Sequence, residues 1–122
     1  MSERVRQDLC ARALRFSIAV SAFHRAAAPR GPTTAHAAMQ LFRAATGVGA
    51  NLEEGQVSKT RGDMAAKYAL ALREARESLY WLRLLADDPA LTKDASELAQ
   101  EAGEFVAMLT VSVRKLRSEG WG

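Results

Sequence analysis

The sequence is poor in the residues that would staple the chain, hold a metal cluster or cross a membrane. Its one cysteine, Cys10, rules out an internal disulfide and a zinc site made of several thiolates. No apolar run reaches the roughly 18 residues that a membrane span needs, and the N-terminal residues lack the apolar stretch of a signal peptide. We therefore expect a protein of the reducing cytoplasm that makes no membrane contact.

Helix-breaking residues are scarce as well. The 122 residues include only three prolines and eight glycines, whereas alanine is abundant, and this composition favours helix over strand. Apolar residues make up 48% and charged residues 25%, an ordinary globular balance that argues against disorder. A chain of this length forms one domain and can bury a core without staples.

Apolar residues recur every three or four positions in four long segments, which predicts four amphipathic helices. The predicted helices cover residues 2–27, 34–56, 61–86 and 90–118. Pro and Gly at 29–32, a polar loop at 58–62 and the stretch Asp87-Asp88-Pro89 separate them. Because short loops make neighbouring helices antiparallel, we expect an all-α, up-down-up-down four-helix bundle in one domain, residues 1–122.

Several local features refine this expectation. Thr33 or Thr34 can cap the second helix, and Thr60 with Asp63 resembles a capping box that opens the third. Glycines in the last turns of the second helix suggest a bend or a close approach to another helix. The first helix has an apolar stripe at Val5, Leu9, Ala13, Phe16, Val20, Phe23 and Ala27. The third has a heptad at Ala65, Tyr68, Leu72, Ala75, Leu79, Leu82 and Ala86.

No recognisable catalytic chemistry is present. Helical bundles hold di-iron sites with Glu-x-x-His pairs, but neither His24 nor His36 has an acid three residues before it. Cys10 has no activating partner in the sequence, and phosphate-binding and nucleophile-elbow motifs are missing. Glu53 and Glu54 are adjacent and diverge on a helix. We expect no metal, no cofactor and no enzymatic activity.

Charge is unevenly distributed along the chain. Residues 1–62 carry nine Lys or Arg against four Asp or Glu, a net +5, and residues 87–104 carry six acids against Lys93, a net −5. The overall charge of +3 and pI of about 9.4 are compatible with nucleic-acid binding without establishing it.

Rows of arginine are the remaining candidates for a binding surface. Arg73, Arg76 and Arg83 lie along the third helix with Tyr80 among them, and arginine beside an aromatic ring can hold phosphate and stack on bases. Alternatively, the interleaved Glu74 and Glu77 neutralise this face. The other candidate nucleic-acid or partner-binding residues are Arg12, Arg15, Arg43, Arg114 and Lys115.

The third and fourth helices also carry more apolar residues than one core seam requires. A helix that is apolar on several faces is buried on several faces, so the surplus favours a homo-oligomer. Scattered surface apolar residues are the alternative explanation. The predicted interface residues are Leu70, Trp81, Leu84, Val106 and Met108, and Trp81 is the one least expected in water.

The stretch 40–55 reads Gln-Leu-Phe-Arg-Ala-Ala-Thr-Gly-Val-Gly-Ala-Asn-Leu-Glu-Glu-Gly. It resembles the signature of the small four-helix-bundle proteins first noticed in intervening sequences of 23S ribosomal RNA genes, a family that includes the accessory variability determinant of diversity-generating retroelements. The matching positions are Gln40, Arg43, Ala44, Ala45, Ala50, Asn51, Glu54 and Gly55, with Thr60 and Asp63 at the loop that follows.

The resemblance implies a protomer that assembles into a homopentameric ring. For the retroelement members it implies a basic ring that binds nucleic acid and a reverse transcriptase. Three positions depart from the signature: Gly49 replaces a proline, Phe42 an arginine and Glu53 an alanine. The last two make this chain less basic there. We interpret Asn51 and Glu54 as structural residues that hydrogen-bond a neighbouring helix or loop.

These observations leave three hypotheses. The first is a non-enzymatic homo-oligomeric scaffold that binds RNA, DNA or a protein, such as a reverse transcriptase, through its basic face. The second is a protein-only adaptor that uses the acidic face of the fourth helix or the ends of the bundle. The third, a small enzyme or ligand-binding bundle, ranks well behind.

Overall fold

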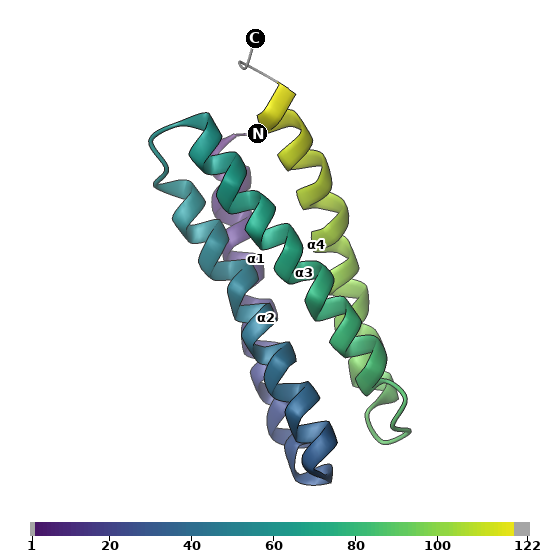
Figure 1. The fold of residues 1–122 in the computed structure, drawn as a ribbon. Coiled ribbons are helices and arrows are strands. Elements are labelled where there is room, and N and C mark those ends of the chain that lie inside the picture. The colour runs from purple at the N-terminus through teal and green to yellow at the C-terminus, as the bar shows by residue number, and fades with distance from the viewer. Residues whose placement is uncertain (1, 119–122) are drawn as a thin grey trace.

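A computed structural model of the chain describes residues 2–118. It contains the helices α1 (Glu3–Ala27), α2 (Pro32–Gln56), α3 (Arg61–Leu85) and α4 (Thr92–Ser118), with a short 3₁₀ helix, η1 (Ala28–Arg30), between the first two. The helices run antiparallel in sequence order (Figure 1). The predicted all-α, up-down-up-down bundle is confirmed. None of these helices is long and apolar enough to span a membrane.

Helix boundaries follow local chemistry. The Ser2 hydroxyl accepts a hydrogen bond from the Val5 amide at 3.2 Å, and the Thr60 hydroxyl accepts one from the Asp63 amide at 3.0 Å, as the capping motif predicts. The prediction that Thr33 or Thr34 caps α2 is wrong. The helix begins earlier, at Pro32 behind Gly31 with φ 146°, because proline's fixed φ suits the first helical position.

The core lies where the four apolar stripes meet. Tyr68, Phe105, Leu41, Leu52 and Leu82 are the largest fully buried side chains. The rings of Phe16 and Phe105 lie 5.6 Å apart and join α1 to α4 at the middle of the bundle. Alanines in the α2–α3 contact allow these two helices to pack closely along their lengths.

The buried face of α3 differs from the predicted heptad. Leu72 and Leu79 are only half-buried, whereas Ala71, Ser78 and Leu85 are buried. Because α3 packs against both α2 and α4, its buried arc is wider than a single heptad seam. The buried Ser78 hydroxyl is satisfied by donating to the Glu74 carbonyl at 2.9 Å.

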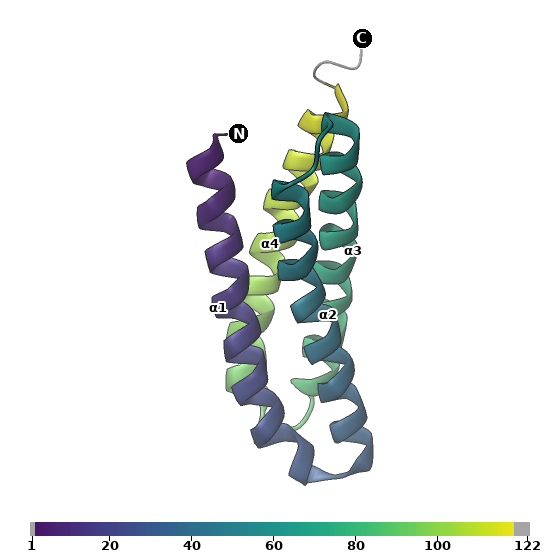
Figure 2. The same cartoon turned by 90° about the vertical axis from the view of Figure 1, so that its left-hand side faces the viewer.

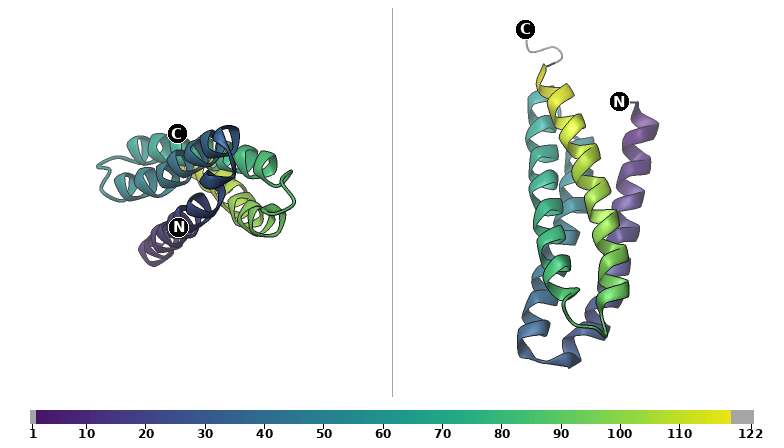
Figure 3. Two further views of the ribbon diagram at one scale, coloured as in Figure 1. Left: turned by 90° about the horizontal axis from the view of Figure 1, so that it is seen from below. Right: turned by 90° about the vertical axis from the view of Figure 1, so that its right-hand side faces the viewer.

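The helices are not equally close along the bundle. α1 has few contacts with α4, while α2–α3 and α3–α4 have many. Figures 2 and 3 show the N-terminal half of α1 standing away from the C-terminal half of α4, next to the α2–α3 loop. Val5 belongs to the predicted core stripe but is 52% exposed for this reason.

Candidate functional site

The interior offers no reactive centre in the described part of the chain. No group of three or more His, Cys, Asp or Glu side chains there could hold a metal ion. Burial raises the pKa of the Cys10 thiol, with the charge of Glu53 adding to the effect, so the thiol stays protonated near neutral pH and is a poor nucleophile. Burial also raises the pKa of Tyr68, whose hydroxyl accepts a hydrogen bond from Gln56 Nε2 at 2.7 Å.

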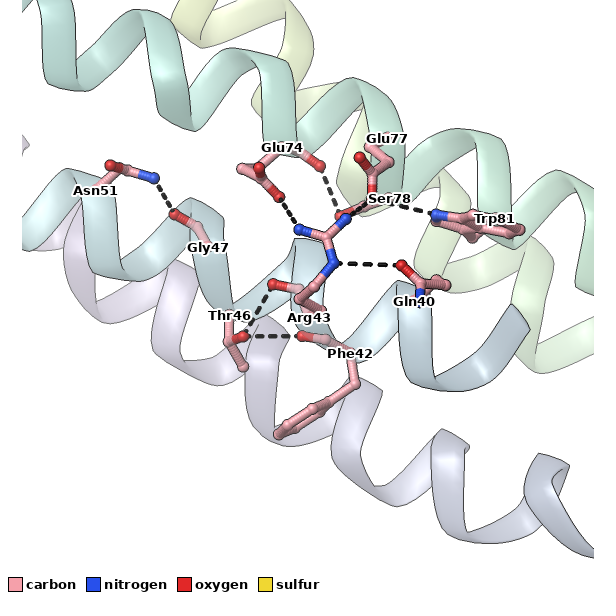
Figure 4. A network of polar contacts seen from close by, with 10 residues as sticks. All are labelled: Gln40, Phe42, Arg43, Thr46, Gly47, Asn51, Glu74, Glu77, Ser78 and Trp81. Atoms are coloured by element: carbon pink, nitrogen blue, oxygen red, sulfur yellow. Dashed lines mark hydrogen bonds and ion pairs between the residues drawn. The ribbon is translucent and has the colours of Figure 1, made fainter. Parts of the chain in front are cut away.

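A polar network joins α2 to α3 (Figure 4). The Arg43 guanidinium lies between Glu74 and Glu77, with Nη1 3.6 Å from Glu74 Oε2 and Nη2 paired to Glu77. Its Nε donates to Gln40 Oε1 at 3.3 Å, and Trp81 Nε1 donates to Glu77 at 3.3 Å. The two glutamates of α3 therefore neutralise an arginine of α2.

That pairing leaves the arginines of α3 uncompensated by their own helix. Arg73, Arg76 and Arg83 are exposed and form no ion pair with a residue in the range 2–118. At 100° per residue they fall within one arc of the helix, and this arc includes Tyr80, which is 62% exposed. Alternating charge in the sequence does not become alternating ion pairs on this surface.

The C-terminal turns of α4 extend the same face. Leu72 of α3 lines a shallow hollow together with Arg114 and Arg117 of α4, so these cations lie beside the α3 arc. Both α4 arginines are exposed. We call this surface the α3–α4 basic face: Arg73, Arg76, Arg83, Arg114 and Arg117, with Tyr80.

The other predicted basic residues lie elsewhere. Arg12 makes a bidentate pair with Glu101 of α4, both N–O distances being 2.7 Å, and its guanidinium carbon lies 5.5 Å from the centre of the Phe105 ring. The Arg12 hydrogen bonds hold the pKa of Glu101 below its usual value. Arg15 and Lys115 flank a separate groove between α1 and α4. The eight predicted residues thus occupy three locations.

The α1–α4 groove is an open cavity of about 1000 Å³ at the end of the molecule that holds the α2–α3 loop. Its apolar lining comes from three helices and includes Val5, Leu9, Met64, Met108, Val111 and Leu116. Its cations are Arg6, Arg12, Arg15, Lys59, Arg61 and Lys115, against the single acid Asp8. The groove was not predicted from the sequence, because the divergence of α1 from α4 has no signature in the apolar pattern.

The predicted interface residues divide into two groups. Leu70 and Leu84 are 40% and 48% exposed, which leaves apolar surface for a second copy to cover. Trp81, Val106 and Met108 are half-buried against the protomer's own core. The Trp81 ring meets His36 of α2 edge-on, with centroids 6.2 Å apart, so part of its cover comes from within the protomer. Sequence reasoning missed Leu14 and Ile18, 60% and 61% exposed on α1, although their i, i+4 spacing off the core stripe could have revealed them.

The signature residues lie at helix contacts. Glu54 accepts from Lys67 Nζ of α3 at 2.8 Å, which ties the end of α2 to α3 as expected. For Asn51 the expected bond to a neighbouring helix or loop is wrong: its Nδ2 donates to the Gly47 carbonyl of its own helix at 2.9 Å, one turn back. Gly55 lies directly against the Tyr68 ring, where an added β-carbon would come within 2.8 Å of it. These contacts agree with a structural role for Asn51, Glu54 and Gly55.

The molecule is thus a small antiparallel four-helix bundle whose helices are joined by ion pairs and hydrogen bonds, with no metal-binding cluster in its described residues. Residues 7–111 match the family described as 23S rRNA-intervening sequence protein, and the chain belongs to that family. No curated protein matches it. A crystal structure from Bacteroides thetaiotaomicron, of a protein with unknown function from the S23 ribosomal protein family, is similar in fold. Its TM-score is 0.78 and its identity 23%, over 87% of this chain and 98% of that one.

Proposed function

We propose that the protein is a non-enzymatic, self-associating scaffold that binds the phosphate backbone of nucleic acid through the α3–α4 basic face. The observation that carries the proposal is that Glu74 and Glu77 form ion pairs with Arg43 of α2. Because these two glutamates are used there, Arg73, Arg76 and Arg83 stay exposed and unpaired. Exposed guanidinium groups bind phosphate oxygens, and Tyr80 adds a ring on which a base can stack.

Self-association would strengthen such a surface. One protomer offers five arginines on this face, a modest site for polynucleotide. Copies held together by the exposed Leu70 and Leu84 would present it several times, and linked sites gain avidity without any new contact. The homopentamer and the reverse transcriptase partner implied by the family resemblance fit this scheme and belong to the proposal.

The test is fluorescence anisotropy of a labelled structured RNA and a DNA duplex at about 50 and 200 mM salt, with the protein's mass measured in the same buffer. We expect binding that weakens with salt, log K falling by about 0.9 per tenfold rise in salt for each duplex phosphate contacted. The double variant R76E/R83E should weaken binding at least about tenfold. The matched control R25E, an exposed arginine of α1, should stay close to wild type.

No binding to either nucleic acid by an intact oligomer would overturn the nucleic-acid part of the proposal. A loss of log K in R25E, with one charge reversed, that is about half of the loss in R76E/R83E, with two charges reversed, would instead indicate attraction by net charge alone, without a defined face. A protein-only adaptor would then become the better interpretation.

A further inference from the structure

The α1–α4 groove combines two properties that the proposed nucleic-acid face does not use. Its floor is apolar, with Val5 and Val111 about half exposed there, at 52% and 48%. Its edges are basic, and Arg15, Lys59 and Lys115 form no ion pair within the part of the chain described. An apolar floor with unpaired cations along its edges is complementary to a segment that is apolar on one side and acidic on the other.

The dimensions suit a helix. The α1 side of the groove runs from Val5 to Arg15, and ten residues at 1.5 Å each span about 15 Å, or three turns. An occupant helix of about that length would lie between α1 and α4 where these two helices diverge (Figure 2). It would complete the packing that α1 lacks there, since α1 has few contacts with α4.

Residues 2–118 of a second copy do not supply such a segment. Its acidic stretch is the first half of α4, where Ala95, Ala102 and Phe105 are buried in its own core and Glu101 already pairs with Arg12. Some of the apolar residues that it exposes on its helices lie beside cations instead. Leu14 neighbours Arg15, and Leu84 neighbours Arg83, so docking either would set like charges together.

Nucleic acid fits the groove no better. None of the groove's lining residues is aromatic, so bases find no ring on which to stack. The apolar floor donates no hydrogen bonds to phosphate or to base edges. The α3–α4 basic face, which carries Tyr80, has the chemistry that the groove lacks for that ligand.

We propose that the α1–α4 groove is the docking site for an acidic amphipathic helix of a different protein. Leucine-like side chains on one face of that helix fill the space over Val5, Met108 and Val111. Glutamate or aspartate side chains on its flanks meet Arg15, Lys59 and Lys115. The scaffold thereby holds a protein on one surface and nucleic acid on another.

The test uses the intact protein labelled with ¹³C at its methionine methyl groups, because two methionines line the groove and one described methionine does not. The probe is a synthetic helical peptide of about 14 residues, with leucines at spacings of three and four and glutamates elsewhere. We expect it to shift the methyl signals of Met64 and Met108 while leaving Met39 unchanged, with a dissociation constant of about 10 μM or below. A scrambled peptide of the same composition should bind at least about tenfold more weakly.

Variants place the binding in the groove. V111E and the double variant R15E/K115E should each weaken peptide binding at least about tenfold, since the first puts like charge on the floor and the second inverts the edges. I18E and R25E, matched exposed positions of α1 outside the groove, should bind as wild type does. R76E/R83E should also bind the peptide normally, which separates this site from the nucleic-acid face.

Four outcomes would overturn the proposal. Patterned and scrambled peptides could bind equally, or V111E could bind as tightly as wild type. In the third outcome the peptide fails to bind while V111E lowers the mass of the protein in solution, and the groove would then belong to a second copy. An RNA that shifts Met64 and Met108 when the peptide does not would assign it to nucleic acid.

Discussion

Gly55 shows how one missing side chain fixes the contact between two helices. It lies one residue before the end of α2 against the buried Tyr68 ring, and a β-carbon there would lie 2.8 Å from Cε1 of that ring. The ring cannot move easily, because it is fully buried and its hydroxyl accepts from Gln56 Nε2. We expect G55A to destabilise the fold by about 1–3 kcal/mol through overpacking, offset in part by alanine's better helix propensity.

Gly103 supplies the matched control for that substitution. It lies in the interior of α4, and nothing would touch an added β-carbon within 4 Å. G103A should therefore stabilise the protein by up to about 1 kcal/mol, the propensity difference alone. Urea unfolding followed by circular dichroism compares the two variants. A G55A protein as stable as G103A would show that the Tyr68 contact is not tight.

At the scale of helices, one ion pair compensates for the weak packing between α1 and α4. Arg12 and Glu101 are each about one-third exposed, and their bidentate geometry is worth about 1 kcal/mol, the upper end for a pair so accessible to solvent. We expect E101Q to lower stability by about that amount near neutral pH. E97Q, which removes an exposed charge of the same helix that makes no ion pair within residues 2–118, should have little effect.

The same pair predicts a pH dependence. Because Arg12 lowers the pKa of Glu101 in the folded state, the contribution is present above the carboxyl's ordinary pKa of 4.5. It is lost as the pH falls through the lowered folded value. The difference in melting temperature between E101Q and wild type should therefore shrink below about pH 4. A difference that stays constant down to pH 2 would mean that the substitution acts through packing and not through charge.

Elements and their contacts differ in how far the sequence predicts them. Four helices and the Thr60 cap follow from patterns within a few residues, and the structure confirms them. The ion-pair partner of Glu74 and Glu77 cannot be predicted from such local patterns, because their pairing with Arg43 depends on the register between α2 and α3. The half-burial of Trp81 against His36 depends on the same register. Distances between helices are tertiary information that helical periodicity does not carry.

At the scale of the whole molecule, the two proposed binding surfaces, the α3–α4 basic face and the α1–α4 groove, lie on different sides of the bundle. The arginines of the α3–α4 basic face lie on the outer arc of α3 and on the C-terminal turns of α4, while the groove opens between α1 and α4. Rows of arginine in the sequence named these basic residues as candidates, but their separation among the α3–α4 basic face, the α1–α4 groove and the Arg43 ion pairs could not be predicted from it. Basic residues that the sequence groups together thus lie on separate surfaces in the fold.

The proposed assembly gives the last prediction. Leu70 and Leu84 are large apolar side chains 40% and 48% exposed on α3, and covering the exposed part of one is worth roughly 0.6–1.4 kcal/mol, or up to about tenfold in a dissociation constant. We expect sedimentation at micromolar concentration to give a mass above the 13.3 kDa of one chain, and L70K/L84K to shift it toward the monomer. Helicity and melting temperature of the separated protomer should show that its core is intact.

V57K, at a residue 80% exposed beyond the end of α2, is the control and should leave assembly unchanged. A wild-type protein that sediments as one chain would remove self-association from the proposed function, and nucleic-acid binding would then rest on the five arginines of a single face.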